Sequence, residues 1–266
     1  MMRYSQGQLD EWLSFARELV ADSRDLLASR SDWSSQFKPD RTLVTQLDLE
    51  IEQKLRERIL LRYPGHGVLG EEFGARERDA EWLWVLDPID GTASFMAGMP
   101  VYGTLIALLH QGAPVLGVID QPATDDCWIG RQGLPTLLFT RDGARECRTR
   151  GCASLERAFV SVSSPDFFLP EERPVWQGFC QRSGWRVYGG ACRSYGLLAS
   201  GRTDLALDAG LKLYDYAAMR PIIEGAGGVI SDWEGRAITL DSGSRVLAAG
   251  DPARHREALD LIQRLG

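Results

Sequence analysis

Two aspartates three positions apart offer the clearest chemistry in this sequence. Asp87 and Asp90 follow the apolar run 82–86, which predicts a buried strand, and the Asp-Pro and Asp-Gly steps predict a tight turn directly after it. In that turn the two carboxylates and the carbonyl oxygen of Ile89 would surround one point. Oxygen ligands of this kind suit a hard cation such as Mg²⁺. Residues 91–92 would then begin a helix, whose free N–H groups attract a phosphate group.

A plain surface turn is the alternative for these acids, because Asp-Pro and Asp-Gly are common turn formers. The longer string Asp-Pro-Ile-Asp-Gly-Thr-Ala-Ser-Phe at residues 87–95 is far more specific than the pair alone. It resembles a signature of the inositol monophosphatase superfamily, whose members are Mg²⁺-dependent, lithium-sensitive phosphatases of sugars and inositols.

Three further acids extend the resemblance. Glu71 ends one predicted strand, Asp215 begins a predicted helix, and Asp48 lies in the first turn of another helix. Each also has an ordinary interpretation: a solvated loop acid, a helix N-cap and a partner of the helix dipole, respectively. The string Tyr-Asp-Tyr-Ala-Ala at 214–218, followed by Glu-Gly-Ala-Gly-Gly at 224–228, resembles the second superfamily signature.

The resemblance implies a role for each residue. Asp48 and Thr92 would orient the attacking water, and the N–H groups of Gly91 and Thr92 would hold phosphate oxygens. Lys38 corresponds to a lysine of a mobile loop near the site, although a solvated surface lysine is the simpler interpretation. The implied metal ligands are Glu71, Asp87, Ile89 through its carbonyl, Asp90 and Asp215.

The charge balance agrees with bound cations. The chain has 30 Lys and Arg against 37 Asp and Glu, a net charge of −7, which disfavours binding to nucleic acid and to anionic membranes. Clustered carboxylates without partners would repel one another and become protonated. We therefore expect two or three Mg²⁺ ions per site, which would activate a water molecule for in-line displacement at phosphorus without a covalent intermediate.

The periodicity of apolar residues predicts the elements that position these groups. Helices are expected at 7–29 and from about 47 to 62, and strands at 67–71, 82–86, 103–109, 115–120, 127–130, 137–140 and 144–148. From about residue 155, strands alternate with helices, including one at 215–226, which is typical of layered α/β packing. The resemblance implies an α+β fold of the αβαβα sandwich type. Residues 1–150 would form an N-terminal half with most metal ligands, and residues 151–266 a C-terminal half that completes the site.

The composition limits the class of protein. The sequence has no run of eighteen apolar residues, so no transmembrane helix is expected, and its first residues do not resemble a signal peptide. Five widely spread cysteines are an odd number without metal-site spacing, so reduced thiols in the cytoplasm are expected. A homodimer is expected from the resemblance alone.

The substrate is expected to be a small phosphate monoester. The stretches 66–74, 103–109, 116–122 and 209–212 resemble the histidinol-phosphate phosphatases, which act late in histidine synthesis. Ala191 and Arg193 stand where that group has Asp and Tyr, and Asp208 stands where it has Glu. These three residues are predicted to lie near the alcohol side of the substrate. Histidinol phosphate is therefore the first hypothesis, an inositol or polyol phosphate the second, and a regulatory, partner-binding role the third.

Overall fold

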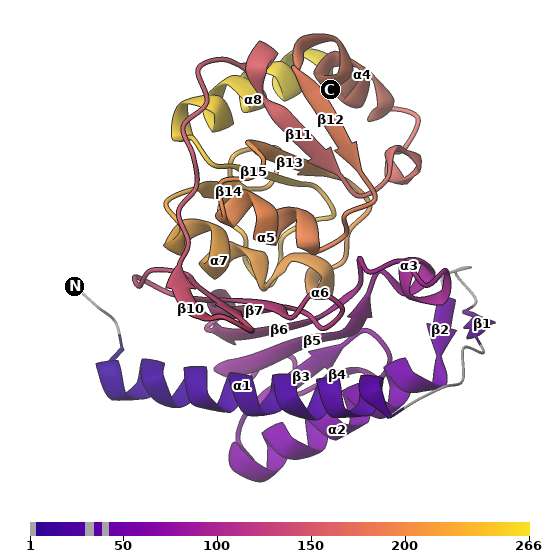
Figure 1. Ribbon diagram of the computed structural model, residues 1–266, viewed down its shortest axis with the longest axis vertical. Coiled ribbons are helices and arrows are strands. Elements are labelled where there is room, and N and C mark those ends of the chain that lie inside the picture. Colours follow the sequence, from indigo (N-terminus) through magenta and orange to yellow (C-terminus); the bar gives the residue numbers. More distant parts are fainter. Residues whose placement is uncertain (1–3, 30–34, 39–42) are drawn as a thin grey trace.

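The computed structural model describes residues 4–29, 35–38 and 43–266, and these form five stacked layers (Figure 1). The layers are, in order, two long helices, an eight-stranded sheet, three short helices, a five-stranded sheet and two further helices. This is the predicted αβαβα sandwich. The helices are α1 (Gln6–Ala28) and α2 (Gln46–Arg62) in the first layer, α5 (Arg193–Ala199), α6 (Leu213–Tyr216) and α7 (Met219–Gly225) in the third, and α4 (Arg173–Arg182) and α8 (Pro252–Leu265) in the fifth.

The eight-stranded sheet is antiparallel except for one parallel pair, β3 with β5. Its strands, in spatial order, are β10 (Gly143–Glu146), β9 (Leu137–Thr140), β8 (Asp126–Arg131), β7 (Ala113–Gln121), β6 (Gly103–His110), β5 (Trp82–Asp90), β3 (Gly67–Gly70) and β4 (Gly74–Arg76). Because β3 and β5 run parallel, their carboxyl ends lie at the same edge. The residues that follow β3 therefore lie beside the end of β5.

The five-stranded sheet is mixed, with β12 and β13 parallel to β11 and the pairs with β15 antiparallel. Its spatial order is β12 (Trp185–Tyr188), β11 (Phe159–Val162), β13 (Leu205–Asp208), β15 (Val246–Ala249) and β14 (Val229–Ser231). Helix α7 packs on β7 and β8 of the other sheet. The two halves of the chain thus share one core, and the division at residue 150 stays a prediction.

Alternate residues of β5 face opposite layers. Trp84 and Leu86 pack in the core beneath α1 and α2, whereas Leu83 and Val85 pack in the core that includes α5, α6 and α7. Asp87 continues the second series, because side chains of a strand alternate between its two faces. Its carboxylate therefore points toward the middle layer, from which Asp215 comes.

The predicted turn after residue 86 is wrong, because β5 continues to Asp90. Pro88 cannot donate a ladder hydrogen bond, and the register shifts at this point: Asp87 pairs with Leu105 and Asp90 with Gly103. Residues three apart in a regular strand would face opposite sides. The extra residue of the bulge returns Asp90 to the face that Asp87 occupies.

The predicted helix 215–226 is wrong as a single element, because it is divided into α6 and α7. Pro221 has no N–H to donate to the carbonyl of Ala217, so the helical ladder breaks between them. Two glycines let this segment lie directly on the sheet. A Cβ atom on Gly117 would lie 1.9 Å from the carbonyl oxygen of Ala218, and one on Gly130 would lie 2.4 Å from the backbone of Pro221.

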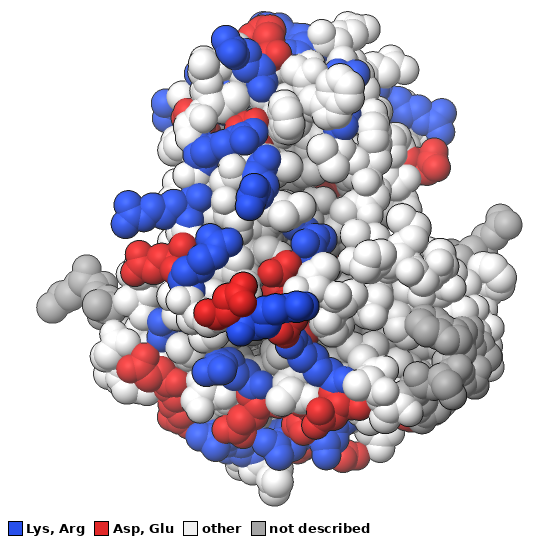
Figure 2. Space-filling model, in the orientation of Figure 1, with Lys and Arg blue, Asp and Glu red and all other residues white. Residues whose placement is uncertain are grey.

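Several smaller elements complete the fold. A capping box of Ser5 and Gln8 begins α1. The helix expected to begin at residues 91–92 is present as α3 (Thr92–Met96), whereas the hairpin of β1 (Ser35–Phe37) and β2 (Leu43–Thr45) and the strand β4 were not predicted. Acidic and basic side chains intermingle on the lower part of the face in Figure 2, where α1 and α2 lie, and ion pairs such as Arg58–Glu18 connect these helices. None of the helices in the described part of the chain combines the length and apolar character that crossing a bilayer requires.

Candidate active site

A cavity of about 700 Å³ lies where β5, α3 and α6 meet. Its lining combines acidic residues with aromatic and aliphatic ones. The lining residues are Phe37, Lys38, Leu43, Glu71, Asp87, Ile89, Asp90, Gly91, Thr92, Ala93, Ser94, Ser163, Phe167, Gly189, Ala191, Gly210, Leu211, Lys212, Tyr214 and Asp215. The cavity thus gathers residues from both halves of the chain.

Four carboxylates from three segments line this cavity. Glu71 follows β3, and its N–H donates to the carbonyl of Leu86 at 3.2 Å, which places it beside Asp87. Asp90 accepts a hydrogen bond from the backbone N–H of Cys192 at 2.6 Å. Asp215, in α6, accepts one from the N–H of Lys212 at 2.6 Å. The structure therefore places at one cavity the four acids that the resemblance implied as metal ligands, whereas Asp48 is not among the lining residues.

Burial and mutual repulsion disfavour the charged forms of these acids. Desolvation is the largest cause of the strongly raised pKa of Asp87, and the charges of Glu71, Asp90 and Asp215 add to it. The pKa of Asp215 is also raised well above its ordinary value, again by desolvation first. Burial likewise raises the pKa of Asp90, although the hydrogen bond from Cys192 opposes it. A cation in the cavity would reverse this balance.

The chemistry of the donor set at the cavity fits a hard metal ion. Within the described ranges, no three acidic, histidine or cysteine side chains converge closely enough to hold an ion as they stand. However, Oδ1 of Asp87 and Oδ1 of Asp48 are buried and have no hydrogen-bond partner there. Buried polar atoms are normally satisfied, so these two oxygens are suited to a cation or to its water. An all-oxygen set favours Mg²⁺ over softer metals.

Lys38 lies at the cavity rather than on an open surface. Its Nζ contacts Oε1 of Glu71 at 2.7 Å and Oε1 of Glu72 at 2.8 Å. Desolvation alone would lower the pKa of Lys38, but its hydrogen bonds to the two glutamates raise it above the ordinary value. Burial raises the pKa of Glu72 to about 7, although the bond from Lys38 lowers it. Lys38 thus neutralises the charge of Glu71, one of the predicted metal ligands.

The side chains of Asp48 and Thr92 each form hydrogen bonds with a residue three positions earlier in the chain. Asp48 is fully buried, and its Oδ2 accepts hydrogen bonds from the backbone N–H and the hydroxyl of Thr45. The hydroxyl of Thr92 donates to the carbonyl of Ile89 at 3.0 Å. Desolvation raises the pKa of Asp48 despite the bonds from Thr45. Gly91, with φ +83°, begins α3, which has only five residues and therefore a small dipole.

The three predicted substrate contacts separate. Ala191 lines the cavity, but Arg193 and Asp208 are not among its described lining residues. Arg193 donates to Oγ1 of Thr124 at 2.6 Å and lies 3.2 Å from Asp126. Its charge is therefore directed to the turn between β7 and β8.

Asp208 is buried and already satisfied. It accepts hydrogen bonds from the N–H of Ser163 at 2.7 Å and the hydroxyl of Tyr195 at 2.8 Å. Burial raises its pKa to about 6, and both bonds oppose that rise. This carboxylate holds β13 to neighbouring elements instead of facing the cavity.

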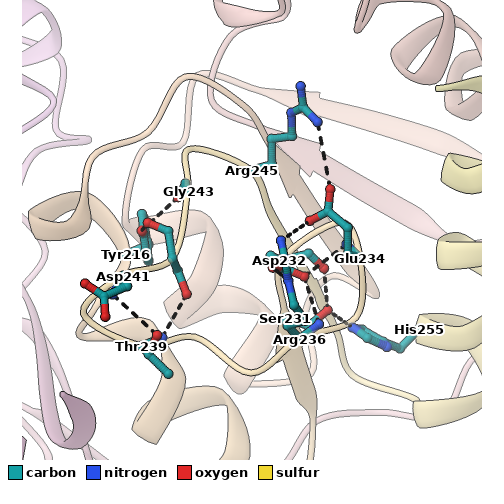
Figure 3. Close-up of polar contacts among 11 residues, drawn as sticks. Tyr216, Ser231, Asp232, Glu234, Arg236, Thr239, Asp241, Gly243, Arg245 and His255 are labelled. Carbon is teal, nitrogen blue, oxygen red and sulfur yellow. Dashed lines mark hydrogen bonds and ion pairs between the residues drawn. The ribbon is translucent and has the colours of Figure 1, made fainter. Parts of the chain in front are cut away.

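Figure 3 shows two clusters of polar contacts, one around Tyr216 and one around Asp232 and His255. The hydroxyl of Tyr216, next to Asp215, donates to the carbonyls of Ser242 and Gly243, each at 2.8 Å, and so anchors α6 to that loop. Ser231 Oγ lies 3.0 Å from Nε2 of His255, but both residues are buried, and neither lines the cavity. The serine–histidine pair is therefore a core contact and not a nucleophile with its base.

A buried hydroxyl network supports the bulge that carries the aspartates, and the sequence motifs did not reveal it. Oγ1 of Thr104 donates to the carbonyl of Pro88 at 2.9 Å, and Ser23 of α1 lies 2.7 Å from the same Oγ1. Because Thr104 uses its proton on a carbonyl, it accepts from Ser23. A threonine within an otherwise apolar strand was the available signal for this role.

Replacing Thr104 with Val is expected to weaken both the fold and the site. The buried carbonyl and the serine hydroxyl would lose their partner, which costs about 1–3 kcal/mol of unfolding free energy. The freed bulge would also move the aspartates and lower kcat/KM by about 10-fold. Denaturant unfolding and steady-state kinetics measure the two effects. Thr104→Ser, which keeps the hydroxyl, should retain both; equal losses in the two variants would contradict the role of the hydroxyl.

Comparisons with known proteins agree with this geometry. The profile of the Inositol monophosphatase family matches residues 8–265. The chain is 38% identical over 270 residues to the bifunctional phosphatase IMPL2, chloroplastic, of Arabidopsis thaliana. This match covers 97% of this chain and 77% of the relative. It is 37% identical to the histidinol-phosphatase of Mycobacterium tuberculosis, over 75% of this chain and 78% of the relative.

A solved structure is similar over the whole fold. An inositol monophosphatase from Zymomonas mobilis superposes with a TM-score of 0.86 at 36% identity, and the match covers 98% of this chain and 100% of that one. The relatives' names support a hydrolase of phosphate monoesters and divide between histidinol and inositol phosphatases. The family match over nearly the full length, together with the acidic cavity, leads to one conclusion: this chain belongs to the inositol monophosphatase family.

Proposed function

We propose that this protein is a Mg²⁺-dependent phosphatase and that histidinol phosphate is its substrate. The convergence of four carboxylates on one cavity is the observation that carries the proposal. Glu71, Asp87, Asp90 and Asp215, with the carbonyl oxygen of Ile89, would hold two or three Mg²⁺ ions. When bound, Mg²⁺ supplies Lewis-acid chemistry, because it lowers the pKa of water and offsets charge on phosphoryl oxygens.

The chain's own residues would bind the phosphate and manage the proton. Gly91 and Thr92 line the cavity, and their backbone N–H groups would donate to phosphate oxygens. Oδ1 of Asp48 would accept a hydrogen bond from the attacking water, since its other oxygen is held by Thr45. The raised pKa of Asp48 suits a group that accepts a proton. Movement of the Lys38 side chain from Glu71 into solvent would make the Glu71 carboxylate available to the ions.

The apolar residues of the cavity favour a flat leaving group. Phe37, Leu43, Phe167 and Leu211 are among the lining residues, and the first and third are 78% and 53% exposed. Large exposed apolar side chains at a cavity often mark a ligand contact. An imidazole ring can stack on such a surface, whereas the hydroxyls of a cyclitol need polar partners. Arg193 is paired with Asp126. The guanidinium charge, which would otherwise repel the cationic amine of histidinol phosphate, is therefore neutralised.

A substrate panel tests the proposal. We expect kcat/KM for histidinol phosphate to exceed that for inositol 1-phosphate by about 100-fold, which corresponds to about 2.7 kcal/mol. Phe167→Ala should lower kcat/KM for histidinol phosphate by about 10-fold and leave glycerol 2-phosphate nearly unchanged, because only the ring loses its contact. Leu169→Ala, an equally exposed apolar residue outside the cavity lining, is the matched control.

Other results would select the alternatives. Broad activity, or a preference for inositol 1-phosphate, would support the polyol phosphatase that the structural relative suggests. No Mg²⁺-dependent release from any ester would contradict the enzyme proposal and favour a partner-binding role. A homodimer and a cytoplasmic location belong to the same proposal; the free state of all five cysteines supports the latter, and sedimentation analysis tests the former.

A further inference from the structure

A buried glutamate on α2 lies directly behind the acidic side of the cavity. Glu52 is fully buried and stands one helical turn after Asp48, so both carboxylates lie on the same side of α2. Ile51 and Leu55, beside it, belong to the core beneath the first sheet. An acid in such a stripe is exceptional, since burying a carboxylate is costly unless it is paired and hydrogen-bonded.

The carboxylate of Glu52 is directed to the backbone of the segment that carries Glu71. Its Oε2 accepts from the N–H of Glu72 at 2.7 Å, and its Oε1 accepts from the N–H of Phe73 at 3.1 Å. Nε of Arg56, one turn further along α2, donates to Oε1 at 2.7 Å and balances the charge. The buried acid is thus satisfied by two amides of one turn and by one cation.

The preceding strand is shaped around this carboxylate. A Cβ atom on Gly70 would lie 2.0 Å from Oε1 of Glu52, so a larger residue at the end of β3 would displace this carboxylate. The close approach lets the helix carboxylate reach the backbone of the turn 71–73. Lys38 contacts the side chains of Glu71 and Glu72 in the same turn.

We propose that Glu52 is a positioning residue that sets Glu71 for metal binding. By holding the amides of Glu72 and Phe73, it fixes the backbone from which the Glu71 carboxylate enters the cavity. Because Asp48 comes from the same helix, α2 places the water-binding acid and the turn of Glu71 in one rigid register. This inference rests on the proposed function only in taking Glu71 as a metal ligand.

Calorimetric titration with Mg²⁺ and Mn²⁺, without substrate, tests the inference on the full chain. Glu52→Gln keeps the size of the side chain but removes its charge and one acceptor oxygen. Groups that orient metal ligands typically affect metal affinity by about 10- to 100-fold, so we expect the Kd for metal to rise by at least about 10-fold. The kcat at saturating Mg²⁺ should change less. Glu57→Gln, an exposed glutamate on the same helix, should leave the Kd unchanged.

Hydrogen exchange of the unmodified protein gives a second test that needs no variant. The amides of Glu72 and Phe73 should exchange slowly, because a buried carboxylate holds both. Fast exchange of these amides, or a Glu52→Gln variant that folds and binds metal as tightly as the parent, would overturn the inference. If the parent protein itself binds neither ion, the proposed function fails instead, so the two failures are distinguishable.

Discussion

Asp90→Asn is expected to lower kcat/KM by about 10³-fold, or about 4 kcal/mol of transition-state stabilisation. The amide keeps the shape of the side chain and can still accept the hydrogen bond from the N–H of Cys192. What it loses is the negative charge next to Asp87 and Asp215. A site that depends on cations then holds them more weakly, and the charge that develops on the phosphoryl group is left without compensation. Phosphate release at several Mg²⁺ concentrations measures the loss.

The same substitution should stabilise the metal-free protein. Asp90 contributes to the repulsion that raises the pKa of Asp87, and its removal relieves that repulsion in the folded state. Thermal unfolding in EDTA should therefore show a higher Tm for Asp90→Asn than for the parent. Asp142→Asn, an exposed acid in the turn between β9 and β10, should change neither activity nor Tm. Full activity of Asp90→Asn would exclude this aspartate from the metal site.

Without metal, the protein is expected to lose stability as the pH rises from about 4 to 7. Folding raises the pKa values of the cavity acids, so between the unfolded and folded values the folded chain binds more protons than the unfolded chain. Stability then falls as the pH increases through this window. Asp208 and Glu72 mark it, since burial raises their pKa values to about 6 and about 7. Asp87 and Asp215 act in the same direction.

Mg²⁺ should remove this loss of stability. At 100 times its Kd, a ligand bound only by the folded state contributes about 2.7 kcal/mol, which raises the Tm by about 5–10 °C in a chain of this size. The shift should be larger at pH 7.5 than at pH 5, where protons compete for the carboxylates. Thermal unfolding at both pH values, with EDTA or with Mg²⁺, gives the comparison. The same Tm under all four conditions would contradict a metal site built from these acids.

The local motifs predicted the candidate site better than they predicted its backbone. Asp87 and Asp90 were singled out from residue type and spacing, Glu71 and Asp215 from the resemblance to the family, and all four line one cavity. The turn expected after residue 86 is instead a strand with a bulge, because pairing with β6 continues through Gly103. Propensity for a turn is a local quantity, and the hydrogen bonds of a neighbouring strand outweighed it.

The partners of individual side chains could not be predicted. Arg193 was expected near the substrate, but Thr124 and Asp126, about seventy positions away in sequence, bind it at the turn before β8. Glu52 and Thr104 carried no recognisable motif, and their importance lies in backbone groups that only folding brings near. Such contacts depend on the angle and separation of packed elements, which apolar periodicity does not encode.

The sequence by itself determined which residues are able to do chemistry here and where most of the helices and strands form. Acids at the ends of strands and at helix starts, and apolar stripes with periods of two and 3.6, are local features that a single chain displays directly. Only the tertiary structure decided which of these groups meet. The bulge in β5 turned Asp90 to the face of Asp87, the parallel pairing of β3 and β5 put Glu71 beside them, and glycines on β7 and β8 let the segment of Asp215 approach. The physical reason is that convergence requires a register between distant segments, and register is fixed by packing and hydrogen bonds across the whole fold.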